Sequence, residues 1–156
     1  MNKMYRQLLR LFGKSPFFNS AEEQQIIASI TNAERGNRGE VRVHIESKCP
    51  QDDCLERAGE LFTRLGMSGT GEGTAVLLYI AVNDRRAAVF AGPGIYGAGE
   101  PGFWQEVIDR VVRGYKEGRP VEGIESALNI IGDLLRAHAP DEDIAGNELP
   151  DEVSTS

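Results

Sequence analysis

The stretch that most limits the possible folds is the unbroken apolar run from Val76 to Val82. A run of strand length that never alternates with polar positions predicts a strand buried on both faces, at the centre of a sheet between helices. Asn83-Asp84 supplies turn residues, and Ala87 to Ala91 then predicts a second strand that pairs back as a hairpin. Gly92-Pro93-Gly94 ends this strand, and two further glycines predict an irregular segment after it.

A parallel strand is expected before this hairpin. Residues 40–47 alternate between apolar and polar side chains, which predicts a strand with one face on the core and the other wet or half-covered. Asp52 or Asp53 then caps a helix whose apolar stripe contains Leu55, Ala58, Leu61, Phe62 and Leu65. Strand, helix and strand in this order predict a right-handed crossover with parallel strands. The chain is therefore expected to have an α/β fold with a small mixed sheet.

Three helices and one linker complete this interpretation. Ser20 with Glu23 has the spacing of a capping box, and Asn19 with Glu22 is a looser alternative. Pro101 is expected to begin a helix in which Trp104 anchors the core. The final helix is predicted to extend from Val121 to His138, and residues 67–73 are interpreted as a flexible linker.

The charges divide the chain into three parts. At 156 residues, the chain is expected to form one domain over residues 17–140. Residues 1–16 are basic and predict an amphipathic helix over 1–14, which either contacts an anionic membrane surface or packs on the domain. The net charge of −7 is concentrated toward residues 141–156, a tail predicted to be disordered that contains no base and the acids Asp141, Glu142, Asp143, Glu148, Asp151 and Glu152.

The same composition excludes several classes of protein. The mildly acidic body argues against a nucleic-acid-binding surface, which needs clustered bases. No apolar run reaches the length of a transmembrane segment, and a signal peptide is not evident, so the expected location is the cytoplasm. Cys49 and Cys54 lack the spacing of a zinc motif, which leaves two free thiols or one local disulfide. His44 is interpreted as a solvated residue of the polar strand face.

The predicted topology sorts the acidic residues between the two ends of the sheet. Parallel strands share their C-terminal ends, which places Asp52, Asp53, Asp84 and Arg85 together. Glu40, Glu72 and Glu100 are expected at the opposite end, beside the glycine-rich loops 69–73 and 92–99. Asp84 and Glu100 should consequently be too far apart to share one ion.

The second group predicts a metal site. Three carboxylates and the free carbonyls of glycine-rich loops can supply the roughly six to eight oxygens that calcium prefers. Softer metals are disfavoured because no His or Cys ligands converge there. The alternative is that the three glutamates are ordinary solvated surface residues.

Four segments in order resemble the TPM domain family, and specifically its cytosolic, single-domain branch, over about residues 18–138. They are Gly39-Glu40-Val41-Arg42-Val43-His44, Glu60-Leu61-Phe62-Thr63-Arg64-Leu65-Gly66-Met67, residues 76–85, and Phe103-Trp104. The resemblance implies a three-layer α/β/α sandwich, binding of divalent cations and a suspected phosphatase activity. The chain departs from the family pattern at Thr74-Ala75 and at Gly94-Ile95-Tyr96, where the branch often has Gly-Ile-His.

Three functional hypotheses follow. The first is a divalent-cation-binding domain, for calcium before magnesium, with Glu40, Glu72 and Glu100 as ligands and Asp84 as a separate candidate ligand. The second is a metal-dependent phosphatase acting on phosphate monoesters, in which Arg85 or Arg86 steadies the phosphate. The third is a protein-interaction module that assists assembly at a membrane surface through residues 1–14.

Overall fold

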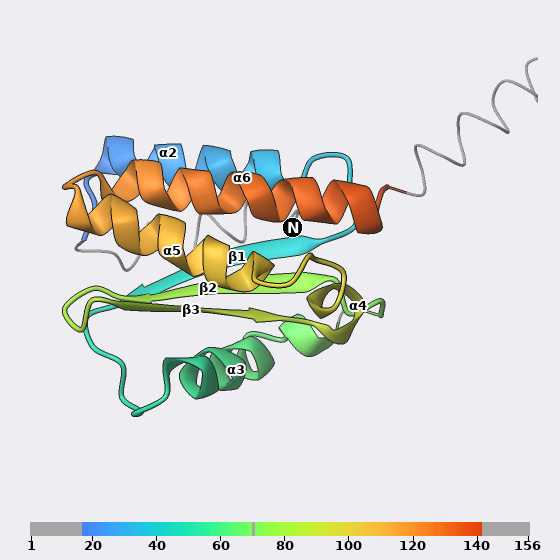
Figure 1. The fold of residues 1–156 in the computed structure, drawn as a ribbon, viewed down its shortest axis with the longest axis horizontal. Helices are drawn as coiled ribbons and strands as arrows, with labels where there is room; N and C mark the ends of the chain where they lie inside the picture. Colours follow the sequence, from blue (N-terminus) through green and yellow to red (C-terminus); the bar gives the residue numbers. More distant parts are fainter. Residues whose placement is uncertain (1–16, 70, 142–156) are drawn as a thin grey trace, which may run out of the picture.

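The computed structural model describes residues 17–69 and 71–141 and places a three-stranded sheet between two layers of helices (Figure 1). The elements are α2 (Ser20–Ala33), β1 (Glu40–Glu46), α3 (Cys54–Arg64), η1 (Met67–Gly69), β2 (Ala75–Ala81), β3 (Arg86–Ala91), α4 (Pro93–Tyr96), α5 (Phe103–Lys116) and α6 (Pro120–His138). Helices α2, α5 and α6 cover one face of the sheet, and α3 covers the other. The expected α/β fold with a mixed sheet is confirmed.

The predicted central hairpin is present. Every residue of β2 is apolar and buried, and its side chains alternate between a larger core, which contains Leu78, and a smaller core, which contains Tyr79. β3 pairs antiparallel with β2, so that Val89 lies opposite Leu78. The turn between the two strands holds Arg85 at a positive φ of 57°, the left-handed region that side chains other than glycine rarely adopt.

β1 lies parallel to β2 on the side away from β3, as the crossover predicted. Its apolar side chains enter the larger core, and its polar face is half-covered. Arg42 is only 3% exposed and donates two hydrogen bonds to one carboxylate oxygen of Glu40, at 2.9 and 3.1 Å. His44 is half-buried and stacks on Tyr79, with 6.1 Å between ring centroids. His44 keeps 32% of its side chain exposed, so this face is half-covered, the second of the two expected alternatives.

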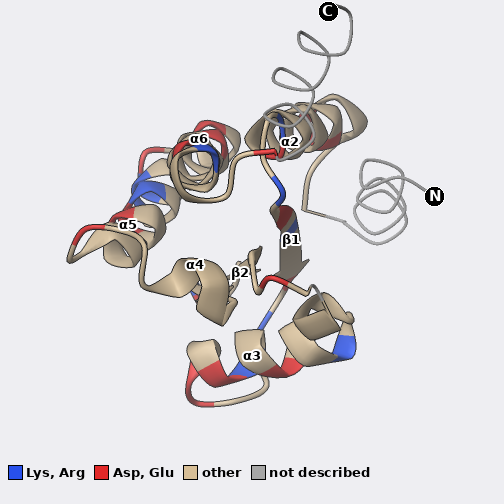
Figure 2. Ribbon diagram, turned by 90° about the vertical axis from the view of Figure 1, so that its right-hand side faces the viewer, with Lys and Arg blue, Asp and Glu red and all other residues tan. Residues whose placement is uncertain are grey.

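The larger core is formed by three helices on the sheet. α2 lies against α6, and α6 lies against α5 (Figure 2). The contact between α5 and α6 is close because glycines face each other. A Cβ added at Gly114 would be 2.6 Å from the Cα of Gly123, closer than two carbon atoms can pack.

Asn19, rather than Ser20, caps α2. The Asn19 side-chain oxygen accepts a hydrogen bond from the Glu22 N–H at 2.9 Å, and the Glu22 carboxylate accepts one from the Asn19 N–H at 2.9 Å. Ser20 is the first helical residue. The looser of the two capping patterns is thus the correct one.

The smaller core lies between the sheet and α3. Met67 is completely buried in it, and residues 67–69 form a 3-10 helix. This part of the segment 67–73 is therefore not the flexible linker that was expected. Asp53 caps α3 by accepting a hydrogen bond from the Leu55 N–H at 2.9 Å. Leu55, which was expected in the apolar stripe, is 49% exposed because the buried position at the helix start is taken by Cys54.

The segment after β3 is more ordered than expected. It contains the short helix α4, and α5 begins at Phe103 after a turn that includes Pro101. Trp104 packs against the larger core from its edge. It is half-buried, and its indole N–H donates to the carbonyl oxygen of Tyr96 at 2.8 Å.

The basic amphipathic segment 1–14 and most of the acidic tail 141–156 lie outside the described residues, so both remain predictions. The same holds for the boundaries at 16 and 140, and for contact with a membrane surface. Within the described ranges, no helix combines the length and apolar character that are needed to cross a bilayer. The cytoplasmic location stays a prediction.

Candidate functional site

Two glycine-rich loops meet at the end of the sheet where β2 begins and β3 ends. The Gly94 N–H donates to the carbonyl oxygen of Gly73 at 2.9 Å. A Cβ added at Gly94 would lie 1.9 Å from the carbonyl oxygen of Glu72, so only glycine fits there. A cavity of about 400 Å³ opens at this junction, lined by Ser68, Glu72 and Pro93 among others. The sequence predicted that the two loops lie at the same end of the sheet, and these contacts confirm the prediction.

The three glutamates predicted at this end differ in their surroundings. Glu40 is buried and paired with Arg42 at 2.9 Å. The Glu72 carboxylate is half-exposed and forms a short ion pair with Arg38. Glu100 is exposed, in the loop between α4 and α5. Among residues 17–69 and 71–141, no three His, Cys, Asp or Glu side chains are grouped closely enough to hold a metal ion.

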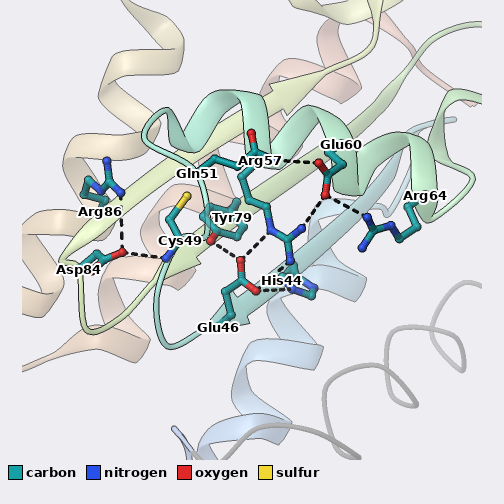
Figure 3. A network of polar contacts seen from close by, with 10 residues as sticks. All are labelled: His44, Glu46, Cys49, Gln51, Arg57, Glu60, Arg64, Tyr79, Asp84 and Arg86. Carbon is teal, nitrogen blue, oxygen red and sulfur yellow. Dashed lines mark hydrogen bonds and ion pairs between the residues drawn. The ribbon is translucent and has the colours of Figure 1, made fainter.

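Asp84 lies at the opposite end, as predicted. One of its carboxylate oxygens accepts the Cys49 N–H at 2.7 Å and is 3.7 Å from the Arg86 guanidinium (Figure 3). Asp84 therefore joins the turn before β3 to the segment after β1. It shares no ligand position with Glu72, because the length of the sheet separates them.

A polar network between β1, β2 and α3 was not predicted from the sequence (Figure 3). Glu46 accepts two hydrogen bonds from Arg57, at 2.9 and 3.1 Å, and another, short one from the Tyr79 hydroxyl. Glu60 then links Arg57, at 2.7 Å, to Arg64, at 3.0 Å. Arg57, Glu60 and Arg64 share helical spacing on α3, but Glu46 and Tyr79 belong to the two strands. Only the packing of α3 on the sheet therefore reveals the whole network.

The network fixes the protonation states of its members. Burial disfavours the Glu46 carboxylate, but hydrogen bonds from Arg57 and Tyr79 outweigh this effect and hold the pKa of Glu46 below its ordinary value of 4.5. Burial, together with the hydrogen bond to Glu46, raises the pKa of Tyr79. The hydrogen bond that Arg57 donates to Glu46 raises the pKa of Arg57 above its ordinary value. A general base needs a pKa near the working pH, so these three groups form a fixed structural network rather than an acid–base pair.

The lowered pKa of Glu46 predicts how stability depends on pH. Because the pKa is lower in the folded state, ionised Glu46 stabilises the fold above its unfolded value, and this contribution disappears as the pH falls through the folded value. The free energy of unfolding of Glu46→Gln should therefore be lower than that of the unmodified protein at neutral pH. The two should converge in acid, as measured by urea unfolding between about pH 3 and 7. Exposed Glu122→Gln is the control, and a constant Glu46→Gln deficit at every pH would contradict the assignment.

The two cysteines are free thiols in the structure. Burial, with a further contribution from a hydrogen bond to Cys49, raises the pKa of the Cys54 thiol. A thiol with a raised pKa is a poor nucleophile because the thiolate is the reactive form. Cys54 is therefore a structural residue.

This difference can be measured by alkylation. At about pH 8, iodoacetamide should modify half-buried Cys49 at least about tenfold faster than Cys54. Mass spectrometry of peptides from a time course would give both rates. The rates should become similar in denaturant, and equal rates in the native protein would contradict the burial of Cys54.

Comparisons with known proteins place this arrangement among related structures. The family model described as TPM domain matches residues 14–134. The BA42 protein of the psychrophilic bacterium Bizionia argentinensis has a similar structure, with a TM-score of 0.72 and 29% identity, over 82% of this chain and 88% of that chain. No match was found among curated proteins.

Two further solved structures share the fold at low identity. The N-terminal domain of a protein from P. gingivalis has a TM-score of 0.65 and 15% identity, over 78% of both chains. The N-terminal domain of cg2496 from Corynebacterium glutamicum has a TM-score of 0.61 and 11% identity, over 78% of this chain and 76% of that chain. Both similarities support the fold alone.

Proposed function

Because the chain belongs to the TPM domain family, we propose that it binds a divalent cation, calcium in preference to magnesium, at the junction of the two glycine-rich loops. The observation that supports this proposal most is the backbone of Glu72. Its carbonyl oxygen faces Gly94 and accepts no hydrogen bond from the described residues. Its carboxylate lies on the same segment and is half-exposed. A hard cation prefers such oxygen ligands.

Only some of the predicted carboxylate ligands are available to an ion at this junction. Glu72 offers the one carboxylate that lines the cavity in the described chain, and exposed Glu100 is not among the lining residues. Glu40 is already occupied by Arg42, and Asp84 belongs to the other end of the sheet. Arg38 competes with a cation for Glu72. Few carboxylates and a competing arginine favour weak binding, with a dissociation constant of about 0.1 to 1 mM.

A calcium titration followed by two-dimensional amide NMR tests this proposal. Saturable shifts are expected at residues 71–73 and 92–100, and magnesium should produce weaker ones. Glu72→Gln should weaken calcium binding by at least about tenfold because it removes the only carboxylate beside the cavity in the described chain. Arg38→Gln should tighten binding by about threefold because it removes a competing positive charge.

Asp84→Asn is the matched control, since it neutralises an acid at the opposite end of the sheet. It should leave calcium binding unchanged. Absence of shifts up to about 10 mM calcium, or loss of binding in Asp84→Asn alone, would contradict the proposed location.

The geometry does not favour the phosphatase hypothesis. Arg85 and Arg86 lie at the turn before β3, whereas Glu72 lies at the end where β3 finishes. The six residues of β3 span about 20 Å. An ion at the glycine loops and a phosphate at these arginines could not meet, so phosphatase activity stays a sequence prediction.

A further inference from the structure

The outer edge of β3 is available for pairing. β3 is the last strand of the order β1-β2-β3. The Gly92 N–H bonds to the Ala75 carbonyl, and antiparallel bonding alternates along the strand, so the backbone groups of Ala87, Val89 and Ala91 point away from β2. No hydrogen bond from residues 17–69 or 71–141 reaches them. β3 also lacks the proline and lysine residues that often protect such an edge.

This edge forms the floor of a groove between two helical walls, which we call the β3 groove. α3 lies on one side of β3 and α5 on the other (Figure 1). The groove has a volume of about 640 Å³, and Leu55 forms part of the α3 wall. Tyr96 and Trp104 form part of the opposite wall, with their rings parallel and 6.3 Å between centroids. Leu55 and Tyr96, 49% and 63% exposed, are the large apolar side chains most exposed in the described chain.

A second cavity continues the β3 groove at the start of β3, and we call it the hairpin pocket. It has a volume of about 390 Å³ and shares Arg85, Arg86, Ala87 and Val112 with the groove. Its lining includes the buried apolar residues Ile80 and Val111, and it also includes exposed Lys116. The combination of an apolar lining and cationic side chains suits the end of a molecule that carries both an apolar group and a negative charge.

The lining of the hairpin pocket contains no acidic residue, whereas Asp52 and Asp53 line the adjoining β3 groove. Arg86 is held by the Asp52 carbonyl at 2.7 Å and lies 3.7 Å from Asp84. Arg85 and Lys116, in contrast, form no ion pair with any described residue. The Tyr115 hydroxyl is buried without a hydrogen-bond partner in the described chain, and burial raises the pKa of Tyr115 to about 12, so it remains a donor.

From these features we propose that the β3 groove binds an extended peptide segment of another protein, and that the hairpin pocket receives the apolar C-terminal residue of that segment with its free carboxylate. The peptide adds a strand antiparallel to β3, through hydrogen bonds to Ala87, Val89 and Ala91. Its C-terminal carboxylate lies at Arg85 and Lys116. At about 3.3 Å per residue, some six residues cover the strand. This function is separate from cation binding, which is proposed at the opposite end of the sheet.

A second copy of the chain fits this edge less well. α3 and α5 flank β3 on both sides, so pairing of two β3 strands would also bring the same helices of a second copy together. A single extended segment carries no helices beside it. The positive charges of Arg85 and Lys116 would also repel those of a second copy, whereas they attract a carboxylate.

The test uses two pools of hexapeptides that alternate Thr with Val, Leu or Phe, one with free C-terminal carboxylates and one amidated. Each pool is titrated into the full chain and followed by amide NMR. The free-acid pool should shift residues 85–91 and 111–116, and slow hydrogen exchange at Ala87, Val89 and Ala91. The amidated pool should bind at least about tenfold more weakly, because it lacks the charge that Arg85 and Lys116 recognise.

Two substitutions test the pocket without disturbing the fold. Arg85→Asn removes the charge and suits the positive φ at this position. Lys116→Gln removes the second charge from an exposed helix position. Together they should reduce the preference for the free acid to about threefold or less. Arg113→Gln, which removes an exposed charge of the same helix outside the hairpin pocket, should preserve the full preference.

Three results would contradict the proposal. Absence of shifts with either pool up to about 1 mM would show that β3 does not accept a peptide. Equal binding of the two pools would show that the hairpin pocket does not recognise a carboxylate. Shifts of β3 that depend on the concentration of the protein alone would assign the edge to a second copy.

Discussion

Replacing Gly94 with alanine should lower the free energy of unfolding by about 3 kcal/mol, the largest effect expected of any single methyl group in this chain. The new Cβ would lie 1.9 Å from the Glu72 carbonyl oxygen and 3.0 Å from that of Gly73. These are backbone atoms, so no side-chain rotation can relieve the clash. The loops must separate and lose the hydrogen bond between Gly94 and Gly73. Urea unfolding monitored by circular dichroism would measure the loss.

Gly97 provides a matched control because it lies just after the same short helix. A Cβ added there has no atom within 4 Å, and its φ is ordinary for other residues. Gly97→Ala should therefore change the free energy of unfolding by less than about 0.5 kcal/mol. Similar effects for Gly94→Ala and Gly97→Ala would mean that the two glycine-rich loops do not touch.

Replacing Arg57 with methionine should also lower the free energy of unfolding by about 3 kcal/mol. The Arg57 side chain is only 13% exposed and contacts both Glu46 and Glu60. Methionine keeps most of the apolar length but leaves the Glu46 carboxylate, which is 22% exposed, without its closest positive charge. Denaturant unfolding at neutral pH would measure the effect.

A double variant separates the cost of an unpaired charge from lost packing. Arg57→Met combined with Glu46→Met removes both charges, and apolar replacement of a buried pair is often neutral or stabilising. The double variant should therefore recover most of the stability lost in Arg57→Met. If the two losses simply added, Glu46 and Arg57 would not interact.

The sequence predicted the parts of the fold that local patterns determine. The apolar run 76–82 has no polar side chain that could face water, which predicted a strand buried on both faces. The turn residues at Asn83 predicted the hairpin that follows. The two ends of the sheet followed from the parallel crossover alone. This topology correctly separated Asp84 from the glycine-rich loops.

The sequence could not predict what covers each face. Arg42 and Glu46 occupy alternate positions of β1, on a face expected to be wet or half-covered, and they pair with Glu40 and Arg57. Glu40 lies two residues from Arg42, and Arg57 lies eleven residues from Glu46. No single sequence period predicts both pairs. Trp104 is a second example. Its helical spacing predicts a core residue, but the structure places it at the edge of the core, where it also lines the β3 groove. In both cases, neighbouring elements decide the environment.

The position of α2 has a consequence for synthesis of the protein. α2 packs against α6, so the first and last described helices depend on each other. On the ribosome, α2 emerges long before α6 exists. The apolar stripe of α2, which contains Ile26, Ile27 and Ile30, can contact β1 but lacks α6 during that interval. Apolar surface that remains exposed favours aggregation. The β2–β3 hairpin can form early from local contacts, but the nascent chain cannot close its larger core until translation has passed His138.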